Sequence, residues 1–378
     1  MIELLNNELS SGAEELMDSV LRDGGRIREE YPLVFEDRFS GSAISLEEGD
    51  QTVASCSILT RDFLIGNHKV KGGLIGSVVT HPDFRGQGHG THMLIQAEAT
   101  LQNQGCAFAI LWAEDPNWYL KRGFGPMSAE HTFLISRDVC EQLPVVNEAR
   151  VMAPQDAQAI HACYAKHQVR VERTLEETKA LLACPDMLVL VCERQGEVVA
   201  YACMGRGRDL QGAVHEWGGE THDVLGLLRV FLELAYPEGR PFETITDPES
   251  GNEVPVAEHI LLMAPPHAAD LCLRLESMGV PSMHGMLALG KILDRQAAAK
   301  ILNDVLGEHG SVELIEGAPR PFRITGKTNQ GELDDEGVFA LLFGVAEVHQ
   351  DVRNFLRTFG LEEANLPLEP FAWGLDSI

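Results

Sequence analysis

The sequence has no long apolar run, no basic start followed by an apolar block and no CxxC pair of cysteines, and each of these absences bears on the class of protein. No apolar run among the 378 residues reaches the roughly 18 residues that a membrane-spanning helix requires. The first residues, MIELLNNELSSGAEEL, show no basic start followed by an apolar block, so we expect no secretion signal. The eight cysteines form no CxxC pair, which favours reduced thiols in a cytoplasmic protein over a disulfide frame or a zinc site.

Positive charge is also scarce. The chain has 57 Asp and Glu against 30 Lys and Arg, which gives a formal net charge of −27. Such a field repels nucleic acid and anionic membranes and attracts cationic small molecules, although acidity that serves only solubility explains the charge equally well. We therefore expect neither a nucleic acid nor a membrane as partner. The hydrophobic content of 44% is that of a soluble globular protein, and the length suits two or three domains.

Strand and helix patterns follow one another twice along the chain and then change. We expect one domain at residues 1–148, a second at 149–291 that begins the pattern again, and a third at 292–378. The segment LKRGFGPM, with Gly123, matches LESMGVPS, with Gly279, after a similar apolar run, which indicates a duplicated fold. The predicted fold class is α/β (α+β), with two mixed-sheet domains followed by a smaller α+β domain.

The last thirteen residues, LPLEPFAWGLDSI, are apolar, whereas disordered tails are usually polar. We therefore predict that this tail is buried, and that the last carboxylate goes with it. The apolar positions that support this prediction are Leu366, Leu368, Phe371, Trp373, Leu375 and Ile378.

A glycine-rich stretch, HPDFRGQGHGTHML, lies at residues 81–94 between an apolar strand and a helical pattern. Backbone N–H groups at a helix N-terminus form an anion site, and glycines let a diphosphate approach them closely. The stretch has no Gly-Lys-Ser/Thr triplet, which excludes a Walker loop, and its G-x-G-x-G spacing departs from the dinucleotide fingerprint. A pyrophosphate held by amides from Gly86 to Thr91 is the reading that we favour over a glycine-rich turn without a ligand.

The segment VVTHPDFRGQGHG resembles the acetyl-CoA-binding motif of the GNAT acetyltransferases, Arg/Gln-x-x-Gly-x-Gly/Ala after a strand and a proline. The resemblance implies that acetyl-CoA is the co-substrate, that the strand at residues 78–80 pairs with its pantetheine arm, and that no metal is needed. The cofactor-binding residues that it implies are Val78, Val79, Thr80, Arg85, Gly86, Gln87, Gly88, His89, Gly90, Thr91, Glu114 and Asp115.

A second motif, WYLKRGFG, resembles the Tyr-x-x-x-Gly-Phe of the same family. The whole chain is similar in size and order of parts to the Eis (enhanced intracellular survival) group, which has a GNAT domain, a second GNAT-like domain and a sterol-carrier-like third domain. That resemblance also implies a homo-oligomer. It is specific in the first 140 residues, whereas the assignment of the third domain depends only on order and size.

Acetyl transfer from a thioester to an amine needs a neutral amine, a stabilised oxyanion and a proton for the leaving thiolate. No cysteine or serine lies in a sequence motif typical of a catalytic nucleophile, so we favour direct attack by the amine. Tyr119, four residues before Gly123, is the candidate general acid, and its alternative role is a packed aromatic ring. Backbone N–H groups near Val78 and Val79 are candidates for the oxyanion.

The general base is less clearly indicated. By resemblance to the Eis group, the C-terminal carboxylate, here of Ile378, enters the active site, although this chain does not end in an aromatic residue. Glu114 and Asp115 are rivals as base. Three histidines, His81, His89 and His92, are expected to flank phosphate or solvent instead. Leu275 stands where the second copy would need its counterpart of Tyr119, and we predict a structural role for that copy.

These observations predict an N-acetyltransferase that moves acetyl from acetyl-CoA to a primary amine of a cationic small molecule or basic peptide. Two alternatives remain at this point. One is a non-catalytic acyl-CoA- or lipid-binding protein, and the other is an acetyltransferase for protein lysines or N-termini.

Overall fold

The computed structural model describes residues 2–5, 11–22, 25–236, 244–246, 253–255, 258–345 and 350–378. It divides the chain into two compact units. Unit 1 comprises Met1–Ala129, Gln168–Cys184 and Met286–Ile378, and unit 2 comprises Glu130–His167 and Pro185–Gly285. Each unit has a mixed sheet with helices, so the predicted α/β fold class is confirmed.

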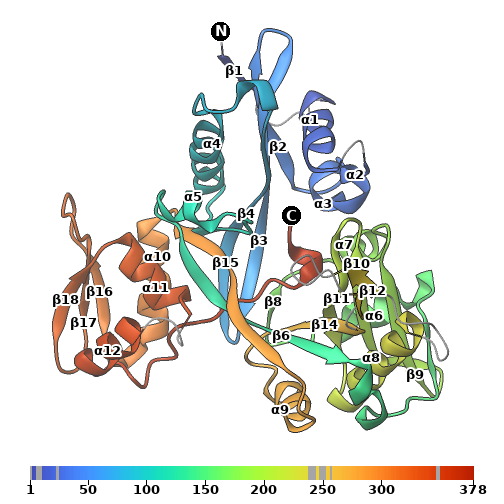
Figure 1. Cartoon of the computed structure of the whole chain (residues 1–378). Coiled ribbons are helices and arrows are strands. Elements are labelled where there is room, and N and C mark those ends of the chain that lie inside the picture. The colour runs from blue at the N-terminus through green and yellow to red at the C-terminus, as the bar shows by residue number, and fades with distance from the viewer. Residues whose placement is uncertain are drawn as a thin grey trace. The chain divides into compact units, whose positions relative to one another are not determined.

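The sheet of unit 1 has the order β1-β2-β3-β4-β5-β15, with β8 paired to β3 (Figure 1). Strands β3 and β4 form a long antiparallel hairpin, while β4 and β5 are parallel. The strands are β1 (Ile2–Leu5), β2 (Ser42–Glu48), β3 (Gln51–Ile65), β4 (His68–Thr80), β5 (Phe108–Leu111), β8 (Val169–Val171) and β15 (Ser282–Ile292).

Helices cover both faces of this sheet. Apolar residues of α4, among them Met93, Leu94, Ala97 and Leu101, pack into a core on one face. A second apolar cluster joins α1, α2 and α3 to β2 and β4 on the other face. The helical elements of this part are α1 (Ser11–Leu21), α2 (Ile27–Glu30), α3 (Pro32–Phe35), η1 (Pro82–Phe84), α4 (His89–Asn103), α5 (Pro116–Leu120) and α7 (Leu175–Leu182).

The C-terminal part of unit 1 shares its core with the sheet. The ring of Phe343 on α11 lies 4.7 Å from that of Phe108 on β5, and Phe339 fills the space beside Gly290 on β15. The elements are α10 (Arg295–Leu306), η4 (Gly307–His309), β16 (Ser311–Leu314), β17 (Phe322–Thr325), β18 (Gln330–Leu333), α11 (Asp335–Phe343), α12 (Gln350–Phe359) and η5 (Gly374–Asp376).

Unit 2 has the strand order β6-β14-β11-β10-β9-β7. Its strands are β6 (Gly125–Ser136), β7 (Ala149–Val151), β9 (Leu188–Arg194), β10 (Glu197–Arg206), β11 (Asp209–Gly218) and β14 (His259–Ala264), and β12 (Thr244–Thr246) pairs separately with β13 (Glu253–Pro255). The helical elements are η2 (Arg137–Gln142), η3 (Pro154–Asp156), α6 (Ala157–Tyr164), α8 (Thr221–Ala235) and α9 (Ala269–Ser277).

Two long strands contribute to both units. The C-terminal half of β6 pairs with β14 in unit 2, from His131 opposite Ala264 to Ser136 opposite His259. The C-terminal end of β15 pairs with β5 in unit 1, where Leu289 is opposite Leu111. The sheet of unit 1 is therefore completed by a strand that lies more than 170 residues after β5 in the chain.

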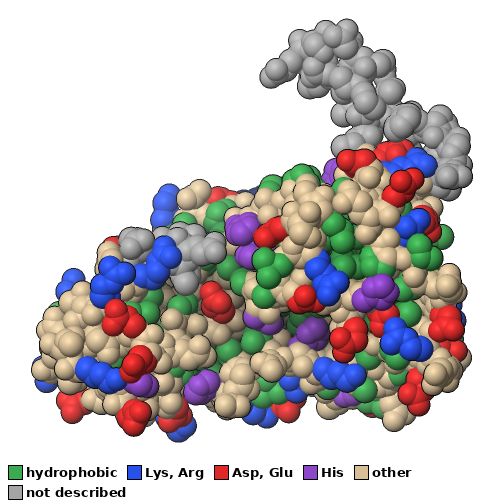
Figure 2. Space-filling model, turned by 90° about the horizontal axis from the view of Figure 1, so that it is seen from below, with side chains coloured by type: hydrophobic (Ala, Val, Ile, Leu, Met, Phe, Trp, Pro, Cys, Tyr) green, Lys and Arg blue, Asp and Glu red, His purple; other side chains and the backbone are tan. Residues whose placement is uncertain are grey.

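The surface carries charges of both signs. On the face in Figure 2, acidic and basic side chains alternate without one large patch of either sign. Within the described ranges, no helix has the combination of length and apolar character that crossing a bilayer requires.

The predicted burial of the C-terminal tail is confirmed. Leu368, Phe371, Trp373 and Leu375 are buried, and Leu366 and Ile378 are half-buried. The backbone of Leu368 also donates to the carbonyl of Leu342, which connects the tail to α11.

Candidate active site

The glycine-rich stretch forms an open loop that ends at the N-terminus of α4. Gly86 and Gly88 have φ values of 78° and 87°, in the left-handed region that favours glycine. Gly88 is the N-cap of α4, which begins at His89. No protein atom lies within 4 Å of the place that a Cβ would take at either glycine, so this side of the loop is open.

The loop therefore presents free space and backbone donors at the positive end of a 15-residue helix. The loop is held in shape by its own chain: the His81 side chain accepts from the Asp83 amide, and Nε of Arg85 donates to the carbonyl of Thr80 at 3.4 Å. An anionic group is the ligand that this arrangement suits.

Strand β4 is irregular just before the loop. Ser55 pairs with Val79 and Ser57 with Gly76, which leaves Cys56 alone opposite the two residues Ser77 and Val78. This is a β-bulge, and Ser77 adopts a φ of 46° there. A bulge disrupts the ladder locally and leaves its extra residue unpaired, and this one lies where the oxyanion donors near Val78 are predicted.

Parallel pairing between β4 and β5 is short. Its register runs only from Gly72 opposite Phe108 to Leu74 opposite Ile110, although β4 continues to Thr80. The edge of β4 that faces β5 thus lies beyond this parallel ladder at residues 75–80. An extended ligand arm can add to such an edge as a further strand.

Tyr119 lies on α5, a short helix whose N-cap Asp115 accepts from the Asn117 amide at 3.1 Å. The ring of Tyr119 packs on the α4 side of the sheet and contacts the rings of Trp118 and Phe124. Burial raises the pKa of the Tyr119 phenol, and the nearby Cys56 thiol raises it further, while Arg122 opposes both. The phenol is therefore protonated at neutral pH and close to the residue opposite the bulge.

Sequence reasoning missed Arg122. Its guanidinium donates to the Trp118 carbonyl at 2.6 Å and to Oγ1 of Thr91 at 2.9 Å, and its Cζ lies 3.6 Å from the centre of the Trp118 ring. Arg122 thus connects the first turn of α4 to α5, which carries Tyr119. Its position directly before Gly123 in the second motif was the signal in the sequence that could have indicated it.

Ile378 reaches the same strand from the other side. Its carbonyl carbon and oxygen occupy the space that a Cβ at Gly76 would take, and it packs with the cluster of α1, α2, α3 and Val79. Tyr119 and Ile378 thus belong to opposite faces of β4 near its bulge. Glu114 and Asp115, the other candidate bases, are exposed.

The remaining candidates lie around the loop. His81, His89, Gly90 and Thr91 are half-buried, and Gln87 and His92 are exposed. No group of three or more His, Cys, Asp or Glu among the described residues could hold a metal ion.

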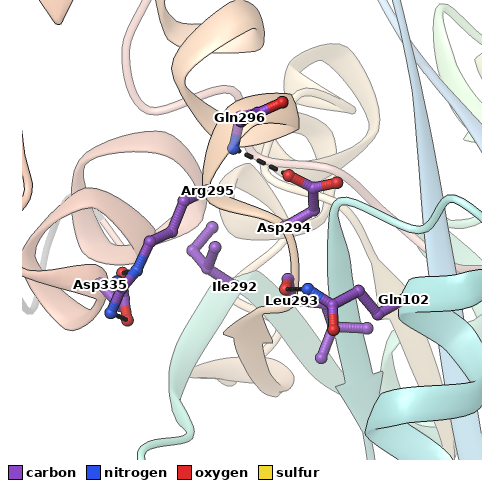
Figure 3. A pocket seen from close by; sticks show the side chains of 7 residues that line it. All are labelled: Gln102, Ile292, Leu293, Asp294, Arg295, Gln296 and Asp335. Carbon is purple, nitrogen blue, oxygen red and sulfur yellow. Dashed lines mark hydrogen bonds and ion pairs between the residues drawn. The ribbon is translucent and has the colours of Figure 1, made fainter. Parts of the chain in front are cut away.

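A separate pocket lies at the other end of α4 (Figure 3). Gln102 lines it and is fourteen residues beyond Gly88, which is about 21 Å along a helix. Four of its polar side chains are engaged with the protein: Arg295 pairs with Asp335, Asp294 caps α10 and Gln102 donates to the Leu293 carbonyl. This pocket is not part of the site around the loop.

Residues 19–127 match the family model described as acetyltransferase (GNAT) domain. Solved structures with similar folds include GCN5-related N-acetyltransferases from Anabaena variabilis (13% identity, TM-score 0.64) and Kribbella flavida (16% identity, TM-score 0.58). Each of these two matches covers 100% of this chain and 100% of the other chain. A probable N-acyltransferase from Enterococcus faecalis has 12% identity and a TM-score of 0.58, covering 79% of this chain and 74% of its own. No curated protein matches the chain in sequence.

The fold, the open amide loop and the family match together define an acyltransferase. The family match covers residues 19–127, which contain the loop and Tyr119, and it is to a GNAT acetyltransferase domain.

Proposed function

We propose that the chain is an N-acetyltransferase that moves the acetyl group of acetyl-CoA directly to a primary amine of a cationic small molecule or basic peptide. The observation that carries this proposal is the joint occurrence of the bulge at Ser77–Val78 in β4, the open loop at Gly86–Gly88 that follows this strand, and the protonated phenol of Tyr119 on α5. The pyrophosphate would bind the loop, and the pantetheine arm would follow the edge of β4.

In the proposed reaction the amine nitrogen attacks the thioester carbonyl carbon, and a tetrahedral oxyanion forms. Backbone N–H groups of the bulge stabilise this oxyanion. The C–S bond then breaks, Tyr119 gives its proton to the departing sulfur, and the amine loses a proton to a base. The carboxylate of Ile378 is the base or cation-holding group that we favour, because Ile378 packs against Gly76 of the bulged strand.

A covalent acyl-cysteine is disfavoured. Cys56 is the thiol nearest to the bulge in the β3–β4 register, and burial raises its pKa to about 12. Burial also raises the pKa of Cys106 to about 11. A thiol in such surroundings is not ionised at neutral pH and is a poor nucleophile.

The three-part division at residues 1–148, 149–291 and 292–378, and the Eis-like arrangement with a sterol-carrier-like third part, belong to the same proposal. The buried tail supports this proposal, because it connects the third part to β4 of the catalytic part.

Titration calorimetry with acetyl-CoA tests the binding half of the proposal. We expect one site per chain, because only the first part has the Arg-x-x-Gly-x-Gly loop. Two equal sites, or no heat at millimolar acetyl-CoA, would contradict it.

A further inference from the structure

Arg173 and Asp376 form an ion pair that is wholly buried within unit 1. Nε of Arg173 donates to Oδ1 of Asp376 at 2.6 Å, and both side chains are 0% exposed. Such a pair adds little net stability, because the desolvation of two charges offsets most of their attraction. The best-attested role of buried polar pairs is to select one register among several similar packings.

The Arg173 side of this pair is held rigidly. The preceding strand β8 pairs with β3, with Val171 opposite Phe63, and the Glu172 amide donates to the carbonyl of Asp62. Directly after Arg173, Thr174 caps α7 in a capping box with Glu177. Glu177 in turn is ion-paired with Arg61 of β3. Arg173 is therefore held against β3 from both sides: by the pairing of β8 before it and by the Glu177–Arg61 ion pair after it.

The Asp376 side belongs to the tail. Asp376 ends the short helix η5, and only Ser377 separates it from Ile378, so the two residues are at most about 7 Å apart at full extension. The position of Asp376 thus determines where the end of the tail lies. That end lies on Gly76, directly before the bulge.

We infer that the Arg173–Asp376 pair is a positioning device that sets the register of the tail, so that Ile378 lies against Gly76 at the catalytic strand. Apolar contacts of Phe371, Trp373 and Leu375 bury the tail but are compatible with small slips along it, whereas a buried charge pair has one geometry. Arg173 acts through the tail and touches no reacting atom. The inference depends on the proposed function for its catalytic consequence, but not for the anchoring itself.

The anchoring is tested without acetyl transfer. In the double variant Arg173→Gln, Asp376→Asn, both charges are removed and the size of the pair is kept. Digestion of the full-length protein with a carboxypeptidase for apolar termini, followed by intact mass, should show Ile378 released about tenfold faster than in the unaltered protein, because local opening becomes easier. The control pair Arg150→Gln, Asp156→Asn removes an ion pair of the same length in unit 2 and should leave the release unchanged.

The catalytic consequence is tested with a double-mutant cycle. The Gln/Asn variant should lower kcat about tenfold with an unchanged Kd for acetyl-CoA, and deletion of Ser377 and Ile378 should cost little more in that background, since coupled residues are non-additive. A purely structural pair would give additive losses. As an independent variant, Gly76→Ala should displace Ile378 and lower kcat likewise, because its Cβ would collide with the carbonyl of Ile378.

Unchanged release of Ile378, or additive losses in kcat, would overturn the inference. If the unaltered protein binds acetyl-CoA and transfers no acetyl group, the proposed function fails, and the release of Ile378 still decides whether the ion pair anchors the tail.

Discussion

The phenol of Tyr119 is the residue on which the proposed chemistry depends most. Its pKa is raised by burial, so it stays protonated through the neutral range and is available as an acid. We predict that Tyr119→Phe keeps the affinity for acetyl-CoA and lowers kcat on the order of 10²–10⁴-fold, because only the proton donor is removed. Steady-state kinetics beside calorimetry measure both quantities.

Tyr236→Phe is the matched control. Its hydroxyl donates to the carbonyl of His259 within unit 2, so its loss removes a hydrogen bond without affecting the site. Turnover of Tyr119→Phe within a few-fold of that control would make Tyr119 a packing residue only.

Glu130 on β6 makes stability depend on pH. Burial raises the pKa of this carboxyl from 4.5 to about 7, with only a weak opposing hydrogen bond from Thr132 at 3.4 Å. Between these two pKa values the folded state holds a proton that the unfolded state has lost, so Glu130 makes the fold less stable as pH rises from about 4.5 to 7.

Glu130→Gln should therefore increase the free energy of unfolding at pH 8 by roughly 1 to 3 kcal/mol and have little effect at pH 4.5. Urea unfolding at both pH values measures this difference. The exposed Glu197→Gln serves as control. An equal effect of Glu130→Gln at both pH values would show that its carboxyl is not the titrating group.

At the scale of elements, the loop before α4 should bind the diphosphate through its backbone. Gly88→Val places a side chain in the open space of the loop and should weaken acetyl-CoA binding at least tenfold, a change of about 1.4 kcal/mol. Calorimetry measures the change in Kd.

Gly105→Val controls for backbone strain. Gly105 follows the other end of α4 with a φ of 83°, close to the 87° of Gly88, and its Cβ position is equally open. Both variants should lose similar stability, and only Gly88→Val should lose affinity. Equal affinities in the two variants would remove the loop from the binding site.

Helix α11 contributes to the core of unit 1 through Phe343. Phe343→Ala should lower the free energy of unfolding by about 3–5 kcal/mol, because a large buried ring against Phe108 is lost. Phe355→Ala on α12, where the ring is half-buried, should cost less. Urea midpoints compare the two, and equal losses would contradict a shared core at Phe108.

Helix α4 was predictable from sequence because its apolar spacing and terminal glycines agree. Met93, Leu94, Ala97 and Leu101 recur at helical spacing and are buried, and Gly105 follows the end of the helix. The partners of β6 and β15 were not predictable, because a period of two residues identifies the faces of a strand and not its neighbours.

The parts of the site that depend on local motifs were predictable from the sequence, and the parts that depend on pairing between distant segments were not. The loop at Gly86–Gly88 follows from its glycines, and the buried tail from its apolar residues. The left-handed residue of the bulge is Ser77, and a serine does not mark that backbone conformation in a sequence as a glycine would. The segment around Arg173 contacts the tail 203 residues later, a separation that no local pattern encodes.

For the whole molecule, the net charge of −27 favours cationic acceptors through long-range attraction. The face in Figure 2 shows charges of both signs interspersed, so the choice among amines must come from the site and not from one acidic patch on that face.

The most direct test of the central claim is acetyl transfer itself. The full chain is incubated with acetyl-CoA and a panel that contains a polyamine, an aminoglycoside, a basic peptide and a neutral amine. Mass spectrometry follows the acetylated amine, and a thiol reagent follows free CoA. The account predicts that a cationic primary amine gains one acetyl group for each thiol released, while the neutral amine reacts slowly. Thiol release at the uncatalysed rate with every amine would contradict it.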